Sequence, residues 1–204
     1  MPHAPVDRLA DTRVPIQDHI AARWSPRAFD PATELDADDL VGLEEAARWA
    51  ATWGRRQPVR FVVGLRGDDA FTTLGGLLKK GNSYARAAAG LILVAADVGP
   101  DEITALYSGV DAGAAMANLS IEAVSRGLVA HPMAGFDTEG AREKFGLADG
   151  LRPLAVVAVG TLAVDAEVGK SRNDGRDLAE RDRQPRTRLP LEEVVLNWPS
   201  LPTG

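Results

Sequence analysis

The longest regular hydrophobic pattern of the chain lies in residues 107–136. Small and apolar residues recur there at steps of three and four, and the first twenty residues contain no Pro. This spacing predicts a helix, which Gly127 is placed to end as a left-handed cap. Residues 128–130 predict a short strand that runs into His131 and Pro132, and Gly135 follows in a turn. A buried helix that feeds a strand and a turn is typical of a fold whose site lies at a strand end.

Hydrophobic patterning predicts further helices and strands on both sides of this stretch. The expected helices cover residues 16–23, a segment from a cap at Asp36 or Asp38 to residue 51, residues 68–80, and a short segment from a cap at Asp137 to residue 145. The expected strands cover residues 60–65, 88–96 and 154–162, and the last two are too continuously apolar to be half-exposed. Helices interleaved with a few strands predict an α+β or mixed α/β domain.

Three stretches lack such a pattern. Residues 1–15 are polar and contain Pro, which predicts an N-terminal arm. Residues 165–185 are dense in charges of both signs and poor in apolar residues, which predicts a mobile loop. The remaining pattern supports a single domain over residues 16–198, with a short tail at 199–204.

Composition narrows the possible functions. The 204 residues carry a formal net charge of −6, which disfavours a general nucleic-acid binder. The chain has no Cys, so disulfides and thiolate chemistry are excluded. Its three His are scattered, and no metal site is predicted. The longest apolar run is too short to span a bilayer and the N-terminus does not resemble a signal peptide, so we expect a cytoplasmic protein without a membrane partner.

A candidate anion site lies in residues 23–29, RWSPRAF. Pro26 disfavours helix at the residue before it, which predicts an extended chain. Alternate side chains of an extended chain share a face, so Arg23, Ser25 and Arg27 would point the same way. Two cations that flank a hydroxyl suit a phosphate. The alternative is a solvated Arg-x-Ser-x-Arg loop.

Other motifs do not predict a site. Gly81 is followed by Asn82 instead of Lys and Ser or Thr, so the preceding glycines are not a P-loop, and no GxGxxG follows a strand. GxSxG is absent, and His131 is interpreted as a structural residue. The pair Glu44 and Glu45 is interpreted as a solvated helix face.

Five segments in order resemble the nitroreductase family over residues 16–198. They are RWSPRAFD, AARWAATWGRRQPVRFVV, GNSYA, GVDAGAAMANLSIEAVSRGLVAHPMAGFD and RTRLPLEEV. The resemblance implies an FMN-dependent oxidoreductase with an α+β fold. It further implies a central mixed, mostly antiparallel sheet flanked by helices, a long central dimer helix, and a homodimer with its flavin site at the subunit interface.

The resemblance implies a role for each residue of the basic segments. Arg23 and Ser25 match residues that hold the flavin phosphate, and Arg27 matches a cation near the pyrimidine edge of the ring. Arg186 and Arg188 match a C-terminal basic pair that closes on the phosphate. A cation near that edge favours the reduced, anionic flavin and so tunes its potential.

A second set of residues matches positions around the flavin ring. Asn82 matches an Asn that hydrogen-bonds the pyrimidine, and Ala134 and Gly135 match a turn whose backbone N–H groups face flavin N5 and O4. Thr52 and Arg55 match residues that approach the flavin from the partner subunit. No side chain needs to act as acid or base, because water can supply the proton, and no catalytic residue is named.

The departures from the family pattern leave alternatives open. Arg55 stands where Asn is usual and Val59 where Trp often follows Gln-Pro. Arg55 and Arg56 would suit an anionic substrate or the phosphate of NADPH, or Arg55 would point to solvent. The leading function is a reductase that takes hydride from NAD(P)H and passes it to nitroaromatic or quinone acceptors in a ping-pong cycle. The alternatives are a flavin storage protein without turnover and a flavin dehydrogenase or oxidase of a biosynthetic intermediate.

Overall fold

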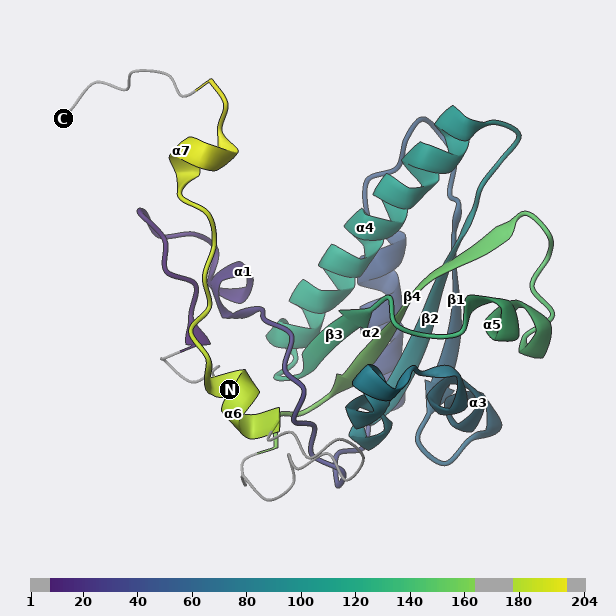
Figure 1. Cartoon of the computed structure of the whole chain (residues 1–204), viewed down its shortest axis with the longest axis horizontal. Coiled ribbons are helices and arrows are strands. Elements are labelled where there is room, and N and C mark those ends of the chain that lie inside the picture. Colours follow the sequence, from purple (N-terminus) through teal and green to yellow (C-terminus); the bar gives the residue numbers. More distant parts are fainter. Residues whose placement is uncertain (1–7, 164–177, 198–204) are drawn as a thin grey trace.

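The structure is a computed structural model, which describes residues 8–163 and 178–197. Figure 1 shows the elements in chain order. The elements are α1 (Asp18–Ala22), α2 (Ala37–Arg48), β1 (Val59–Leu65), α3 (Asp69–Leu77), the 3₁₀-helix η2 (Lys80–Ala87), β2 (Gly90–Asp97), α4 (Glu102–Ser125), β3 (Val129–Met133), α5 (Thr138–Lys144), β4 (Leu151–Gly160), α6 (Leu178–Arg183) and α7 (Leu191–Val194).

The sheet is built from four strands in the order β1-β2-β4-β3. Every neighbouring pair is antiparallel, with Phe61 opposite Val94, Leu93 opposite Val156 and His131 opposite Ala158. The α+β class expected from the sequence is therefore confirmed. In the described part of the chain the sheet is antiparallel throughout, so the expected parallel component of a mixed sheet is not found there.

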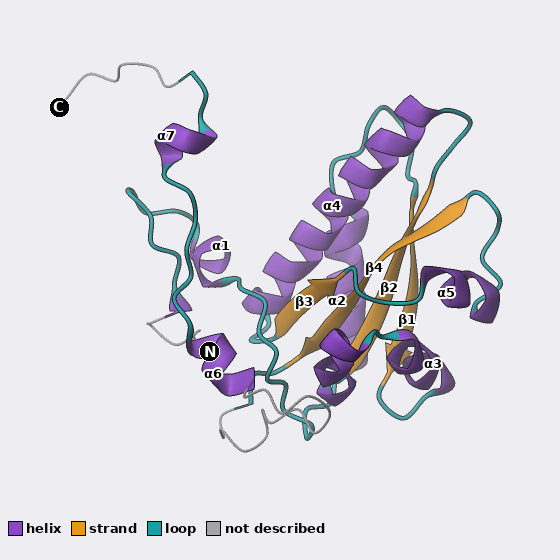
Figure 2. Cartoon of the chain, viewed as in Figure 1, coloured by secondary structure: helices purple, strands orange, loops and turns teal. Residues whose placement is uncertain are grey.

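Helices cover both faces of the sheet (Figure 2). One apolar core joins the sheet to α2 and α4 and includes Leu43, Ile92 and Leu119. The other core joins it to α3, η2 and α5 and includes Phe71, Leu93 and Phe136. The continuous apolar runs of β2 and β4 follow from this arrangement, because both faces of these strands are buried.

Aspartates begin the major helices. Asp36, Asp68, Asp101 and Asp137 are the N-caps of α2, α3, α4 and α5, and the side chain of each accepts a backbone N–H from the first turn. At the other end of α4, Gly127 has a φ of 76°, so the left-handed cap expected there is confirmed.

Two sequence expectations about boundaries are corrected. The helix expected over residues 68–80 ends at Leu77, and η2 follows it, so Asn82 lies inside a 3₁₀-helix instead of after a helix end. Of the charged segment expected to be a loop, residues 178–183 form α6, with Leu178 and Asp182 buried. Residues 164–177 of that segment and the tail 199–204 lie outside the described residues.

The two ends of the chain lie side by side and project from the body, which they touch where α1 contacts α4 (Figure 1). We call residues 8–23 and 184–197 the paired arms. Arg8 donates from Nη1 to the carbonyl of Gln184 at 2.7 Å, and Arg13 forms an ion pair with Glu192 near the far end. The described part of the N-terminal arm is thus fastened, with Arg8 only 7% exposed.

Candidate functional site

The segment of Arg23, Ser25 and Arg27 has the geometry that its sequence predicts. Trp24 and Pro26 are buried, whereas the three polar residues between and beside them are partly exposed. Arg23 Nη1 lies 3.3 Å from Ser25 Oγ, so these two side chains share a face. This alternation agrees with an extended chain that presents two guanidinium groups and a hydroxyl to one side.

Arg186 from the C-terminal arm joins this segment. Its Nη1 donates to the carbonyls of Arg8 and Ala21, and its Nη2 donates to the carbonyl of Arg23 at 2.9 Å. Because two of its three nitrogens serve backbone carbonyls, Arg186 holds the arms together beside the candidate site. Arg188, two residues later, is exposed and donates only to its neighbour Thr187 among the contacts of the described residues.

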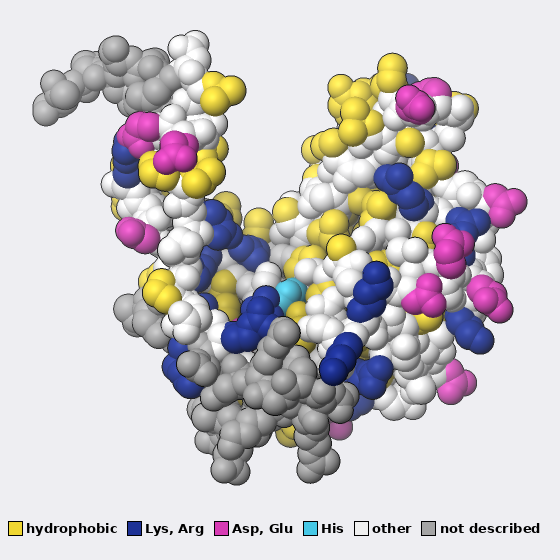
Figure 3. Space-filling model, in the orientation of Figure 1, with side chains coloured by type: hydrophobic (Ala, Val, Ile, Leu, Met, Phe, Trp, Pro, Cys, Tyr) yellow, Lys and Arg dark blue, Asp and Glu magenta, His cyan; other side chains and the backbone are white. Residues whose placement is uncertain are grey.

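Arg8, Arg23, Arg186 and Arg188, which we call the arginine cluster, repel one another. Burial and the Arg188 cation lower the pKa of Arg23. Burial, followed by Arg23, Arg188 and Arg8, lowers the pKa of Arg186. Figure 3 shows Lys and Arg side chains gathered at the base of a hollow between the paired arms and the body. Such concentrated positive charge favours an anionic ligand.

A second part of the site joins η2 to the turn after β3. Asn82 Nδ2 donates to the carbonyl of Gly135 at 2.9 Å, and the same carbonyl accepts the backbone N–H of Lys79 at 3.0 Å. A Cβ at Gly135 would lie 2.6 Å from Asn82 Nδ2, so only glycine allows this approach. Ala134 beside it is exposed. The structure therefore brings together Asn82, Ala134 and Gly135, as the sequence expects.

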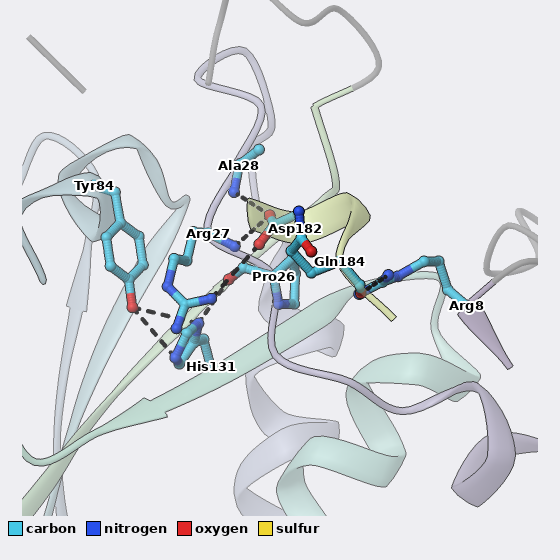
Figure 4. A network of polar contacts seen from close by, with 8 residues as sticks. All are labelled: Arg8, Pro26, Arg27, Ala28, Tyr84, His131, Asp182 and Gln184. Carbon is cyan, nitrogen blue, oxygen red and sulfur yellow. Dashed lines mark hydrogen bonds and ion pairs between the residues drawn. The ribbon is translucent and has the colours of Figure 1, made fainter. Parts of the chain in front are cut away.

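A buried polar network connects these two parts (Figure 4). His131 Nδ1 lies 2.7 Å from the carbonyl of Pro26, and its Nε2 lies 3.2 Å from the Tyr84 hydroxyl. With Nδ1 donating to Pro26, Nε2 accepts from Tyr84, and both ring nitrogens are paired. Burial lowers the pKa of His131 and raises the pKa of Tyr84 to about 12, so both groups are neutral near pH 7.

The two remaining predicted residues, Thr52 and Arg55, lie elsewhere. They belong to the loop of residues 49–58, which we call the outer loop, between α2 and β1. This loop is fixed by a hydrogen bond of 2.9 Å from the Trp53 N–H to Asp111 of α4, and by stacking of Trp53 on Tyr107 at 4.8 Å. Thr52 lines a pocket of about 440 Å³ between α2, β1 and α4. Within one chain, these residues lie on the α2 and α4 side of the sheet.

Four residues of these surroundings were missed or misread in the sequence. Arg8 lies outside the quoted motifs, Tyr84 lies in the GNSYA segment but was given no role, and Asp182 lies in the segment expected to be a loop. Glu44, expected on a solvated face, lines the 440 Å³ pocket with Oε1 buried and without a hydrogen-bond partner in the described part of the chain, and burial raises its pKa to about 7. A helical wheel could have flagged Glu44, because it lies next to the apolar stripe of Leu43 and Ala47.

Comparison with known protein families shows to which family the chain belongs. Residues 20–96 and 66–161 match the Nitroreductase family. The chain belongs to this family. Within residues 8–163 and 178–197, no helix is long and apolar enough to cross a membrane, and no group of three or more His, Cys, Asp or Glu could hold a metal ion.

The chain is also similar to individual known proteins. A 15.4 kDa protein of Mycolicibacterium smegmatis is 58% identical over 145 residues, which is 67% of this chain and 94% of the relative. The crystal structure of an oxidoreductase containing FMN is 31% identical, with a TM-score of 0.80 and coverage of 95% of this chain and 96% of that one. A protein of Exiguobacterium sibiricum 255-15 solved in complex with FMN shares the fold, with a TM-score of 0.70, 20% identity and coverage of 93% and 99%.

Proposed function

We propose that this nitroreductase-family protein is an FMN-dependent oxidoreductase. In the proposed reaction NAD(P)H is the electron donor and nitroaromatics, quinones or related compounds are the acceptors, in a ping-pong cycle. The observation that carries the proposal is the convergence of the arginine cluster with the Asn82–Gly135 turn across the Pro26–His131 contact. The 31% identical FMN-containing oxidoreductase supports the choice of cofactor.

The arginine cluster and Ser25 fit the phosphate of FMN. Arg23 and Arg188 lie close enough for the second to lower the pKa of the first, and Ser25 Oγ lies beside Arg23. A dianionic phosphate would relieve this repulsion and accept charged hydrogen bonds from both guanidinium groups. Arg186 would contribute charge, while its Nη groups keep the arms in place.

The residues beyond the cluster fit the flavin ring. Asn82 and the Ala134–Gly135 turn offer amide and backbone groups, which can hydrogen-bond a planar heterocycle without titrating. Arg27 would place its cation at the pyrimidine edge. When bound, FMN would supply the hydride chemistry, and the protein would bind it, orient it and set its charge environment. No described side chain is needed as an acid or base, because water can supply the proton.

The proposed active form is a homodimer, with Thr52 and Arg55 of one subunit facing the flavin of the other. These residues lie on the opposite side of the sheet from Asn82, so one chain presents two separate halves of a site. Apolar side chains that are exposed near these two halves support the proposal that a second subunit covers them. On α4 and the C-terminal arm they are Ile103, Leu106, Val110, Leu189, Val194 and Leu196.

Anaerobic titration tests the proposed function. Purified protein reconstituted with FMN should be yellow, and NADPH or NADH should bleach it rapidly. An acceptor such as a quinone should then restore the colour. Bound flavin that neither pyridine nucleotide bleaches would favour storage, or a substrate that itself acts as the reductant. Failure to take up FMN would overturn the assignment.

A further inference from the structure

The Arg27 backbone is held from two sides in a way that the phosphate and ring contacts do not require. On one side, the carbonyl of Pro26 accepts from His131 of β3. On the other, Asp182 of α6 contacts Arg27 and Ala28 (Figure 4). Asp182 follows Pro26 by more than 150 residues, so α6 reaches this segment only through the tertiary fold. Both contacts restrain the backbone at Arg27, whose cation is proposed to face the flavin ring.

Asp182 makes three polar contacts with this segment. Its Oδ2 accepts the backbone N–H groups of Arg27 at 2.7 Å and Ala28 at 2.9 Å. Its Oδ1 lies 3.8 Å from Arg27 Nη1 and has no hydrogen-bond donor in the described part of the chain. The Asp182 side chain is 7% exposed, against 30% for Arg27. A buried carboxylate, one oxygen of which accepts no hydrogen bond, therefore faces a partly exposed guanidinium.

This geometry has two separable consequences for Arg27. The two backbone hydrogen bonds fix the direction in which its side chain leaves the chain. Asp182 Oδ1 reduces the positive potential that Arg27 presents outward, because screening by water is weak around a buried charge. A cation near the pyrimidine edge favours reduced, anionic flavin, so a carboxylate behind that cation must oppose this effect.

We propose that Asp182 is a positioning residue that orients Arg27. By partly neutralising the charge of Arg27, it lowers the reduction potential of the bound flavin. The proposal rests on the proposed function, since it concerns FMN in that site. Asp182 touches neither the ring nor the phosphate in this scheme; it acts through Arg27. α6 thereby becomes part of the site, although it lies outside the family motifs in the sequence.

Asp182→Asn separates the two consequences. The amide oxygen can still accept both backbone N–H groups, while the negative charge is lost. The ratio of affinities for reduced and oxidised FMN should rise about tenfold, which shifts the two-electron midpoint potential by about +30 mV. Affinity for oxidised FMN should change little. Spectroelectrochemical titration of FMN-loaded protein measures the potential, and fluorescence quenching of added FMN measures the affinity.

A double-mutant cycle tests whether the effect passes through Arg27. In an Arg27→Met background, Asp182→Asn should shift the potential by less than half as much as in wild type. Asp36→Asn is the control, because Asp36 also accepts a backbone N–H, that of Asp39, through a single oxygen, so the amide can keep the hydrogen bond while the charge is lost. The control should leave the potential of bound FMN unchanged.

The outcomes distinguish this inference from the proposed function. Wild-type protein that takes up no FMN would overturn both. Wild-type protein that binds FMN, with an unchanged potential in Asp182→Asn, would overturn the inference alone. Equal shifts with and without the Arg27 side chain would show a direct field effect and would also overturn it. A positive shift that depends on Arg27 would establish the positioning role.

Discussion

The arginine cluster and the outer loop are opposite in character. In the cluster, charges of one sign crowd together, and Arg186 uses its donors on backbone carbonyls. In the outer loop, Arg55 is exposed and Trp53 stacks on Tyr107, and the nearby pocket contains the half-buried carboxyl of Glu44. The first region is an electrostatic arrangement that an anion would complete, whereas the second is a largely apolar surface that a second protein surface would complete.

The two regions differ in the interaction that ligand binding or association would improve. Guanidinium groups forced together raise the free energy of the unliganded protein, so part of the gain on binding an anion is relief of that repulsion. Exposed apolar side chains raise the free energy of the isolated chain in another way, because their contact with water is unfavourable. Phosphate binding should therefore respond to charge in the cluster, and substrate choice to the outer loop.

The largest expected effect is on flavin retention. The double variant Arg23→Ala, Arg188→Ala should lose bound FMN, because each charged hydrogen bond to the phosphate is worth about 1.5–3 kcal/mol, or roughly tenfold or more in affinity. Equilibrium dialysis or fluorescence titration with FMN measures the loss. Lys144→Ala, Arg152→Ala removes the same net charge from exposed positions and should retain FMN. Normal flavin content in the first variant would contradict the assignment of the cluster.

The next effect concerns the outer loop. Arg55→Asn should change the relative kcat/KM for anionic and neutral acceptors by about tenfold, the scale of one charged contact, and leave the affinity for FMN within about twofold. Steady-state kinetics with a carboxylated and an uncharged quinone, at fixed NADPH, gives the comparison. Identical kinetics across both acceptors would remove Arg55 from the site. A changed acceptor preference with unchanged FMN affinity would support the division between phosphate binding and substrate choice, and a changed FMN affinity would contradict it.

The smallest effect concerns the Glu44 carboxyl. Its pKa is raised from 4.5 to about 7 by burial, so folding favours the protonated form. Its contribution to the free energy of unfolding is fully present below about pH 4.5 and is lost as pH rises through about 7. Glu44→Gln should therefore be more stable than wild type at pH 8 by about 1 kcal/mol, a value discounted because the group remains partly exposed, and similar to it at pH 4.5.

Urea unfolding at the two pH values, at one protein concentration, measures this change. Glu45→Gln is the control, because Glu45 is exposed and pairs with Arg48, so its loss should bring no gain at pH 8. A dimer contact that covers the pocket would make the advantage of Glu44→Gln grow with protein concentration, because it would desolvate Glu44 further. Equal stability of Glu44→Gln and wild type at pH 8 would show that Glu44 is solvated there.

Local sequence patterns determined most elements of this protein. Helical periodicity placed α2 and α4, aspartate caps marked the starts of α2 and α5, and apolar runs marked β2 and β4, because these features depend on neighbours a few residues apart. The alternating burial of residues 23–27, with Arg23 and Ser25 on one face, follows from Pro26 in the same way. The family motifs named Asn82 and Gly135 as separate candidate flavin contacts, and the fold brings the two residues together.

Only the tertiary structure decided which residues surround these motifs. Arg8 meets Gln184 across 176 positions, and Asp182 meets Arg27 across 155. No periodicity encodes such contacts, because they depend on how the arms and α6 pack after the sheet has formed. Glu44 is an intermediate case, because its place beside the apolar stripe of α2 is visible in sequence, whereas the pocket that it lines with β1 and α4 is not. Sequence alone thus determined the elements and the candidate ligand donors, and long-range packing decided their charge environment.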